Sequence, residues 1–411
     1  MRNTGFLWVI MAITLLMDLY IFQVVKSLTI NATPKTRLII TVVYWLVSVA
    51  TVGIVLATPY LTQQNISRSL RTYLFAILIG LFFAKLLASV FFLVDDLRRG
   101  VTWVVKKVAS DKSENGEGIS RSVFLSWLGI AVGGGLMTTF VYGFSNKYNY
   151  QVIRRKLKYS NIPAAFKGLK IVQISDIHSG SFADKKAVMH GVEKIMKEKP
   201  DLILFTGDLV NDRATEMDDY MDVFSQLKAP MGVYSTLGNH DYGDYVAWES
   251  AEIKSKNLDR LKEIHGELGW KLLMNEHVKF ERNGEQIALL GIENWGAKGN
   301  FPKYGKMTEA HAGTEGIPFK ILMSHDPSHW QAEVLEKYKD VDLMLAGHTH
   351  GMQFGVELPG FRWSPVQYMY KQWAGLYENE NQKLYVNRGF GFIGYPGRVG
   401  ILPEITVLTL A

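Results

Sequence analysis

Four apolar stretches of about 20 residues each constrain this chain more than any other feature. They lie at residues 6–25, 38–57, 72–94 and 123–143. A helix of this length crosses a hydrocarbon core of about 30 Å, and backbone in lipid must satisfy its own hydrogen bonds. A cleaved signal peptide would account for the first stretch alone. We therefore expect residues 1–145 to form a transmembrane region with four helices.

Two charged residues fall inside these predicted spans. Asp18 and Lys85 lie at a similar depth in the first and third spans, which run in the same direction. Because a lone charge in lipid is costly, we predict that they form an ion pair. The alternative is that each side chain snorkels separately to the membrane surface. Gly129 and Gly133 predict close helix packing by the fourth span, unless that helix merely tolerates glycine.

Charge and composition narrow the functional classes. Positive charge is concentrated near the predicted spans, as expected beside membrane helices, and no basic groove for nucleic acid is evident, so no nucleic-acid partner is expected. No segment indicates an obligate protein partner, and the absence of cysteine excludes disulfides and thiolate metal sites. Basic residues in the loops 26–37 and 98–121 favour a cytoplasmic location for these loops. We expect a multi-pass protein of the cell (inner) membrane in which the part of the chain beyond the spans is extracytoplasmic.

The remainder of the chain follows a different pattern, beyond a predicted linker at residues 146–164. Five short apolar runs are each predicted to be a buried strand that ends in Asp, Asn or His. The endings are Asp176-Ile177-His178, Gly207-Asp208, Gly238-Asn239-His240-Asp241, His325-Asp326 and Gly347-His348-Thr349-His350. Any one such turn is ordinary, since Asp and Asn cap helices and Gly permits tight turns. Ligands bind at the carboxyl ends of strands in open α/β sheets, so the series predicts one site with oxygen and nitrogen donors. Such a set suits a pair of divalent metals.

The series D-x-H, G-D, G-N-H-D, H and G-H-T-H strongly resembles the motifs of the calcineurin-like metallophosphoesterases. The resemblance covers residues 165–411 and implies an α/β (α+β) domain, a four-layer αββα sandwich of two mixed sheets. It also implies two divalent metal ions, for which Mn, Fe and Zn remain open. The implied ligands are Asp176, His178, Asp208 and His350 for one metal, and Asp208, Asn239, His325 and His348 for the second.

The resemblance extends to catalytic and substrate-binding residues. It implies that His240 contacts the phosphoryl group or the leaving oxygen, and that Asp241 orients the His240 imidazole. Motifs around Arg388 and Arg398 are similar to those of a membrane-associated subgroup, the lipid-precursor (UDP-diacylglucosamine-type) pyrophosphatases and phosphodiesterases. Both arginines are predicted to bind a second phosphate or an anionic head group, and an ion pair with Glu404 is the alternative.

The predicted function is a membrane-anchored dimetal hydrolase that cleaves phosphoester or pyrophosphate bonds with metal-activated hydroxide. The lipid bilayer is one expected partner, and a phosphate-ester substrate, which the membrane anchor suggests is lipid-linked, is the other. The segment 294–316 is predicted to form a lid. With it, five aromatic residues could line an apolar entrance for an acyl chain, unless they serve packing alone: Phe354, Phe361, Trp363, Tyr368 and Trp373. His329 is left open as a further ligand. The competing function is a membrane sensor or scaffold that binds a ligand without turnover, and a transporter is disfavoured by the small number of spans.

Overall fold

The computed structural model describes residues 4–57, 67–108, 120–299, 301 and 303–411. The chain divides into two compact units, Met1–Tyr142 and Gly143–Ala411. We name the first the membrane unit and the second the sandwich unit, after the elements that each contains.

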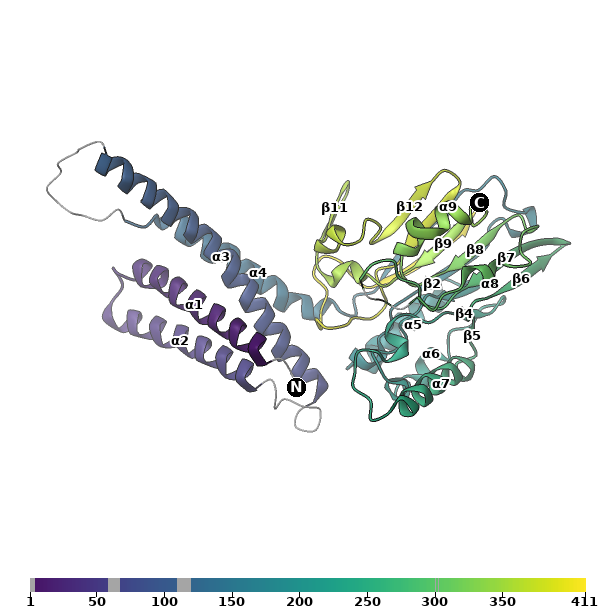
Figure 1. Ribbon diagram of the computed structural model, residues 1–411, viewed down its shortest axis with the longest axis horizontal. Coiled ribbons are helices and arrows are strands. Elements are labelled where there is room, and N and C mark those ends of the chain that lie inside the picture. The colour runs from purple at the N-terminus through teal and green to yellow at the C-terminus, as the bar shows by residue number, and fades with distance from the viewer. Residues whose placement is uncertain (1–3, 58–66, 109–119, 300, 302) are drawn as a thin grey trace. The chain divides into compact units, whose positions relative to one another are not determined.

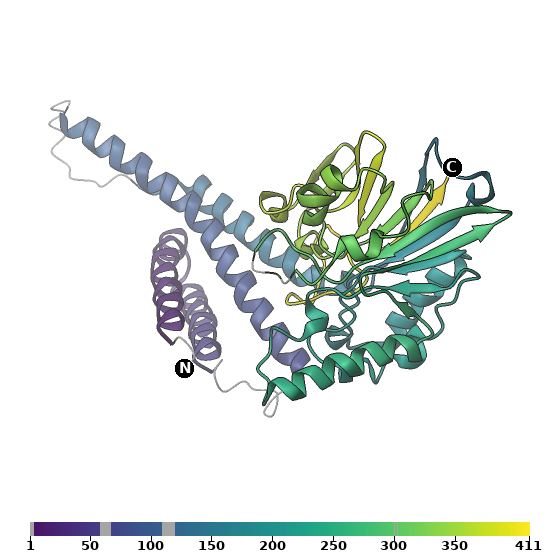
Figure 2. The same cartoon turned by 45° about the vertical axis from the view of Figure 1, so that its right-hand side comes forward.

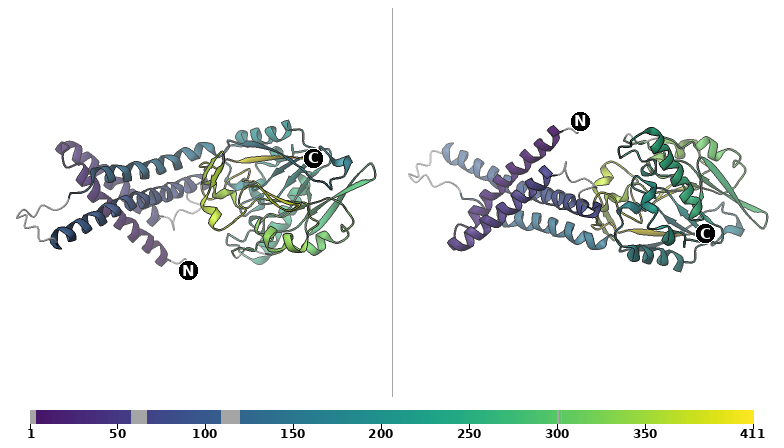
Figure 3. Two further views of the ribbon diagram at one scale, coloured as in Figure 1. Left: turned by 90° about the horizontal axis from the view of Figure 1, so that it is seen from above. Right: turned by 90° about the horizontal axis from the view of Figure 1, so that it is seen from below.

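Four helices form the described part of the membrane unit: α1 Thr4–Leu28, α2 Pro34–Ala57, α3 Arg68–Val108 and α4 Val123–Gly143. Each contains a stretch that is long and apolar enough to cross a membrane. The first two lie side by side (Figure 1), and they cross the other two obliquely (Figure 3). Helix α3 has 41 residues and extends well beyond the predicted span. The predicted loop 98–121 is therefore helical as far as Val108, and residues 109–119 lie outside the described residues.

An ion pair ties three of these helices together. Lys85 Nζ of α3 lies 2.5 Å from Asp18 Oδ1 of α1, and Asp18 is fully buried. On α2, Ser48 donates a hydrogen bond to the other carboxylate oxygen, and Tyr44 donates its hydroxyl to the Asp18 carbonyl at 2.7 Å. The predicted pairing of Asp18 with Lys85 is therefore confirmed.

Helix α4 packs on α3 through small residues. A Cβ atom at Gly133 would lie 2.6 Å from the Ala84 carbonyl oxygen, and one at Gly129 would lie 2.6 Å from a ring carbon of Phe92. At Gly133 only glycine allows so close an approach of the two backbones, and at Gly129 it leaves room for the Phe92 ring. The predicted role of Gly129 and Gly133 is thus confirmed.

Two six-stranded sheets form the centre of the sandwich unit. The first has the order β1-β14-β2-β3-β4-β5, with bounds Gln151–Leu157, Glu404–Leu410, Lys170–Ile174, Leu202–Phe205, Val233–Ser235 and Lys271–Leu272. The second has the order β12-β13-β9-β8-β7-β6, with bounds Gly375–Asn379, Gln382–Val386, Leu343–Ala346, Lys320–Met323, Glu285–Gly291 and Glu276–Arg282. A separate hairpin pairs β10 Val356–Leu358 with β11 Phe361–Trp363.

The prediction that residues 146–164 form a linker is wrong. It contains β1, which pairs in parallel with the C-terminal strand β14 along its whole length. The run Arg154, Arg155 and Lys156 is exposed and hides the strand pattern, because β1 is an edge strand with few buried side chains. Its partner lies at the other end of the sequence, so local reasoning could not reveal the pairing.

Helices cover the outer face of each sheet, which gives four layers (Figures 1 and 2). Helices α5 Lys185–Lys197, α6 Met221–Phe224 and α7 Ala251–Glu267 share a core with the first sheet. Helix α8 Met307–His311 and the short α9 Leu335–Lys337 pack on the second sheet. Side chains of a strand alternate between faces. Ile171 therefore lies between the sheets, whereas Val172 faces the helices. The predicted αββα sandwich is confirmed.

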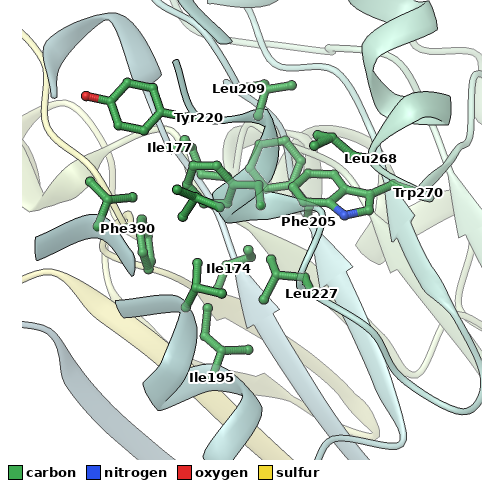
Figure 4. Packing of buried hydrophobic residues seen from close by; sticks show 14 of the residues in the cluster. Ile174, Ile177, Ile195, Phe205, Leu209, Tyr220, Leu227, Leu268, Trp270 and Phe390 are labelled. Carbon is green, nitrogen blue, oxygen red and sulfur yellow. The ribbon is translucent and has the colours of Figure 1, made fainter. Parts of the chain in front are cut away.

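The core beneath the helices holds the strand ends in place. Ile174 and Phe205, the last residues of β2 and β3, pack with Ile195 of α5 and with Trp270 (Figure 4). The Phe205 and Trp270 ring centroids are 5.4 Å apart. Burying each such side chain contributes about 1.5–3 kcal/mol, so the loops that follow these strands start from rigid supports.

Candidate metal centre

Five of the seven predicted metal ligands adopt the left-handed backbone conformation. Their φ angles are 53° at Asp176, 49° at His178, 63° at Asp208, 71° at His348 and 50° at His350. Residues other than glycine rarely adopt this conformation, which costs about 1–3 kcal/mol each. The strained residues all directly follow the buried strands β2, β3 and β9. Strain concentrated at strand ends in this way is typical of a functional site.

Ligating atoms from these loops converge on one buried point. Two groups each have their ligating atoms within 4.8 Å of one another: Asp176, His178 and His350, and Asp176, Asp208 and His325. His178 Nε2 lies 3.0 Å from His350 Nε2, and His325 Nε2 lies 3.1 Å from Asp208 Oδ2. Atoms bound to one cation at about 2.1 Å are separated by about 3 Å, so these spacings match shared coordination.

The remaining two predicted ligands lie beside this cluster. His348 Nδ1 is 2.8 Å from Asn239 Oδ1, and the His348 backbone N–H donates to Asp176 Oδ1 at 3.0 Å. The structure thus brings all seven predicted ligands together from five different loops. Their binding of metal stays a prediction.

An unsatisfied ring nitrogen fits a cation at this point. Among the described ligand residues, His325 Nε2 is buried beside Asp208 without a hydrogen-bond partner. Such an atom costs about 1–3 kcal/mol. His325 Nδ1 contacts the Thr206 carbonyl at 2.7 Å, and since a carbonyl only accepts, Nδ1 carries the proton. Nε2 therefore faces Asp208, where it carries a proton or, in the neutral ring, presents its lone pair to a metal. Carboxylates with neutral imidazoles are a donor set that suits divalent metals.

The electrostatics of the cluster point the same way. Burial raises the pKa of Asp176 and Asp208, but the histidines that face them outweigh it and hold both pKa values below the ordinary range. Burial lowers the pKa of His178 and His350, which keeps both rings neutral near pH 7. Burial also opposes protonation of His325, yet Asp208 raises its pKa to about 10. The carboxylates therefore favour positive charge at this point, as a proton or as a metal cation.

Two motif glycines are required by space. A Cβ atom at Gly347 would collide with Ser175 Oγ and with Asp176 Oδ2. A Cβ atom at Gly238 would collide with Asp208 Oδ1. Glycine at these positions lets the G-H-T-H and G-N-H-D loops approach the carboxylates directly.

The predicted catalytic residue His240 lies at the edge of the cluster. Its backbone N–H donates to Asp208 Oδ1 at 2.8 Å, and its ring centroid is 5.0 Å from that of His178. His240 Nδ1 is 2.8 Å from the Asn211 carbonyl oxygen. Because that oxygen can only accept, Nδ1 carries a proton, and Nε2 is the nitrogen that can exchange one with a substrate.

The prediction that Asp241 orients the His240 imidazole is wrong. Its carboxylate does not orient the His240 ring, which bonds to Asn211 instead. It accepts backbone N–H groups at 2.8–3.3 Å from Gly238, Asp208, Leu209 and Val210. The side chain is fully buried beneath the backbone of two loops. Asp241 is therefore a positioning residue that joins the loop after β3 to the loop after β4.

The two predicted substrate-binding arginines both have protein partners. Arg398 is 0% exposed and donates to the carbonyls of Arg388 at 2.7 Å and of His350 at 3.3 Å, so direct binding of a head group is wrong for it. Its burial lowers the pKa of the guanidinium to about 9. Arg388 forms ion pairs with Glu404 and Glu357, which is the predicted alternative. A substrate contact by Arg388 stays a prediction.

Three residues at the site were missed by the sequence-based assignment. The Tyr370 hydroxyl lies 2.9 Å from His348 Nε2 and 3.3 Å from Asp326 Oδ2. Asn239 donates to the Tyr245 hydroxyl at 2.9 Å. Asp326 directly follows a predicted ligand and could have been suspected on that ground. The two tyrosines stand in no motif, so only the fold reveals them.

Other expectations resolve outside the ligand set. His329 is not a ligand, since Nδ1 lies 3.0 Å from Ser324 Oγ and Nε2 lies 3.1 Å from Glu333. In the predicted lid 294–316, of which residues 300 and 302 lie outside the described residues, the Phe301 ring packs edge-on against His348. Of the predicted entrance aromatics, Trp373 is buried in a small core, whereas Phe361 and Tyr368 are exposed.

Comparison with known proteins identifies the family. Residues 169–352 match the family described as "Calcineurin-like phosphoesterase", and residues 1–147 match "Probable Calcineurin-like phosphoesterase, transmembrane domain". The chain is 30% identical over 309 residues to the "Uncharacterized metallophosphoesterase YkuE" of Bacillus subtilis (strain 168), covering 71% of this chain and 98% of the relative. The chain belongs to the calcineurin-like phosphoesterases. The predicted resemblance and the predicted class of metal-dependent phosphoric ester hydrolases are thereby confirmed at the level of the family.

Two further relatives share parts of this organisation. The "Transmembrane protein with metallophosphoesterase domain" of Danio rerio is 30% identical over 280 residues, which is 66% of this chain but only 60% of the relative. The "Phosphodiesterase YaeI" of Escherichia coli (strain K12) is 28% identical over 262 residues, 64% of this chain and 88% of the relative. The family and the two ligand clusters together indicate divalent metals in a membrane-anchored phosphoesterase.

Proposed function

We propose that this calcineurin-like phosphoesterase uses two divalent metals to hydrolyse phosphoester or pyrophosphate bonds of lipid-linked substrates. The observation that carries the proposal is the convergence of imidazole nitrogens and carboxylate oxygens from five loops on one buried point. The four candidate spans support a substrate that shares the bilayer with the enzyme, because the anchor confines the site to the membrane surface.

The ligands would divide into two sets that share the Asp208 carboxylate. The proposed sets are Asp176, His178, Asp208 and His350, and Asp208, Asn239, His325 and His348. When bound, the metals supply Lewis-acid chemistry, which polarises phosphoryl oxygens and makes hydroxide available near neutral pH. Asp241 supports both sets indirectly, since its carboxylate holds the backbone of Asp208 and of Gly238.

His240 is the proposed general acid. With Nδ1 bonded to the Asn211 carbonyl, Nε2 of the imidazolium can donate its proton to the oxygen that leaves phosphorus. The neutral ring regains a proton from solvent after product departs. Tyr370 is a positioning residue in this scheme, because its hydroxyl holds His348 Nε2.

We further propose that the sandwich unit lies on the extracytoplasmic side of the inner membrane, which the basic segments 26–37 and 98–121 support. The chain has no cysteine, so a single introduced cysteine reports location directly. Lys279→Cys, exposed on β6, should react with an impermeant maleimide in intact spheroplasts. Protection of this cysteine until the membrane is permeabilised would place the unit in the cytoplasm.

The decisive experiment uses the full chain in detergent, stripped with a chelator and reloaded with Mn²⁺, Fe²⁺ or Zn²⁺ in turn. We expect two ions per chain by elemental analysis, and turnover of bis(p-nitrophenyl) phosphate and of a lipid-linked pyrophosphate. Bound metal without turnover of any phosphate ester would refute the enzyme and favour a ligand-binding role. Turnover of the aryl ester alone would refute the lipid-linked substrate.

A further inference from the structure

The β10–β11 hairpin has a polarity opposite to that of an ordinary surface ribbon. Its antiparallel pairs are Val356 with Trp363, Glu357 with Arg362, and Leu358 with Phe361. Since alternate residues of a strand share a face, the two apolar pairs lie on one face and the charged pair on the other.

The charged face of the hairpin packs on the body of the sandwich unit. Glu357 forms an ion pair with Arg388, in which Arg388 Nε donates at 3.1 Å. The Arg362 guanidinium lies 5.1 Å from the Trp373 ring and 5.4 Å from the Tyr377 ring. These contacts fix the orientation of the hairpin, so its apolar face is directed away from the protein by specific bonds.

The apolar face is exposed. Leu358 is 60% exposed, Phe361 56% and Val356 41%. The hairpin projects beside β12 (Figure 1). Tyr368, which accepts a hydrogen bond from Trp363 Nε1 at 3.4 Å, adds a further exposed aromatic ring at 78%. A hairpin with one solvent-exposed face normally has its polar side chains on that face. A cluster of exposed apolar side chains instead marks an interaction surface.

The bonding of the sandwich unit places this surface near the point where the chain leaves the membrane. Gly143 ends α4, the last candidate span, and its carbonyl accepts from Arg398 N at 2.9 Å. The next residue, Val399, pairs with Phe354, and its carbonyl accepts from Gly355 N at 2.9 Å. Gly355 directly precedes β10. Two backbone hydrogen bonds, through Arg398 and Val399, therefore connect the base of the hairpin to Gly143, where the last candidate span ends.

We propose that the β10–β11 hairpin inserts its apolar face into the interfacial layer of the lipid bilayer. Leucine, phenylalanine and tyrosine are side chains that partition into this layer, and the anchored chain keeps them close to it. His350 lies six residues before Val356, so the contact would hold the metal centre at the lipid surface. That consequence rests on the proposed function, whereas the contact itself does not.

The test uses the absence of native cysteine. Leu358→Cys in the full chain is labelled with an environment-sensitive fluorophore and reconstituted into phosphatidylcholine/phosphatidylglycerol vesicles at about one chain per vesicle. The matched control is Lys279→Cys, an exposed position on β6 of another hairpin. We expect doxyl-labelled lipids to quench the Leu358→Cys probe several-fold more strongly than the control. Equal quenching at the two positions would overturn the proposal. A blue-shifted probe that doxyl lipids do not quench would indicate a protein surface, such as a second copy, and would also overturn it.

A second readout separates this contact from the catalytic proposal. Val356→Ser/Leu358→Ser changes only exposed side chains, so the fold should persist, as judged by thermal stability. We expect unchanged turnover of soluble bis(p-nitrophenyl) phosphate and a several-fold rise in the KM for a lipid phosphoester presented in vesicles. Absence of all turnover in the unsubstituted protein would refute the proposed function and leave the quenching result to decide the hairpin.

Discussion

The membrane unit and the sandwich unit each bury carboxylates, and they balance the charge in different ways. Asp18 in the membrane unit is neutralised by Lys85, with Ser48 bound to its second oxygen. Asp208 in the sandwich unit lies 3.1 Å from His325 Nε2 and 3.6 Å from His178 Nε2. Because Lys85 belongs to the chain itself, it neutralises Asp18 at all times, and the ion pair is a structural contact. An imidazole can hold the balancing positive charge as a proton and release that proton when an external cation binds, which is what a metal site requires.

Among the substitutions that test this difference in charge balance, Asp208→Asn should have the largest effect. Loss of this charge should reduce metal content and lower kcat by about 10²-fold or more, because the shared ligand is removed. The measurements are elemental analysis and turnover of an aryl phosphodiester. Asp218→Asn, an exposed acid of the same unit, is the matched control and should alter neither. Full metal occupancy in Asp208→Asn would contradict the bridging assignment.

His240→Ala separates catalysis from metal binding. We expect kcat to fall by about 10²–10⁴-fold, the usual contribution of a general acid, with metal content retained. The loss should be smaller for a p-nitrophenolate leaving group than for an alkoxide, since the poorer leaving group needs the proton more. Equal loss for both leaving groups would argue against the acid role, and metal loss would argue for a ligand role.

The ion pair of the membrane unit should show coupling in a double-mutant cycle. Asp18→Asn and Lys85→Met each leave one charge buried without its partner, so each should be destabilising. The double variant should recover part of the loss, with a coupling energy of about 0.5–3 kcal/mol. Thermal stability in detergent micelles measures it. If the double variant is as unstable as the sum of the single ones, the pair is not energetically real.

The smallest effect concerns a buried histidine away from the metal centre. His265 of α7 packs near Phe205 and Trp270, and burial lowers its pKa to about 3. Because the folded-state pKa is depressed, the neutral ring is fully accommodated above the unfolded value near 6.5. Stability is then lost as pH falls from about 6.5 toward 3, by up to about 1.4 kcal/mol per pH unit.

His265→Leu should therefore flatten the decline of the melting temperature between pH 6.5 and pH 4. The control is His190→Leu, since the His190 side chain is 61% exposed and should leave the decline unchanged. A decline that is equally steep in His265→Leu and in the unsubstituted protein would assign the acid sensitivity to other groups. The difference in charge balance would then concern only the Asp18–Lys85 pair and the metal-ligand cluster, and not His265.

Patterns that depend on neighbouring residues were accessible from the sequence. Runs of about 20 apolar residues predict spans because the bilayer thickness fixes helix length. The D-x-H and G-H-T-H turns predict ligands because they follow buried strands. Gly238 and Gly347, where a Cβ atom would collide with the ligand carboxylates, already stand in the motifs. The depth of Asp18 and Lys85 in parallel spans was enough to predict their pairing, which the structure confirms.

Contacts between distant segments were decided by the tertiary structure alone. Asp241 faces backbone N–H groups of the loop after β3, and the His240 ring bonds to Asn211 in that same loop. Arg398 is enclosed by carbonyls of the C-terminal loops, and β1 pairs with a strand at the opposite end of the sandwich unit. The outward apolar face of the β10–β11 hairpin also follows from its anchors, Arg388 and Trp373. Residue type and spacing determine which local structure forms and which ligands it offers. The partner that a buried charge meets depends on which loops the two sheets bring together.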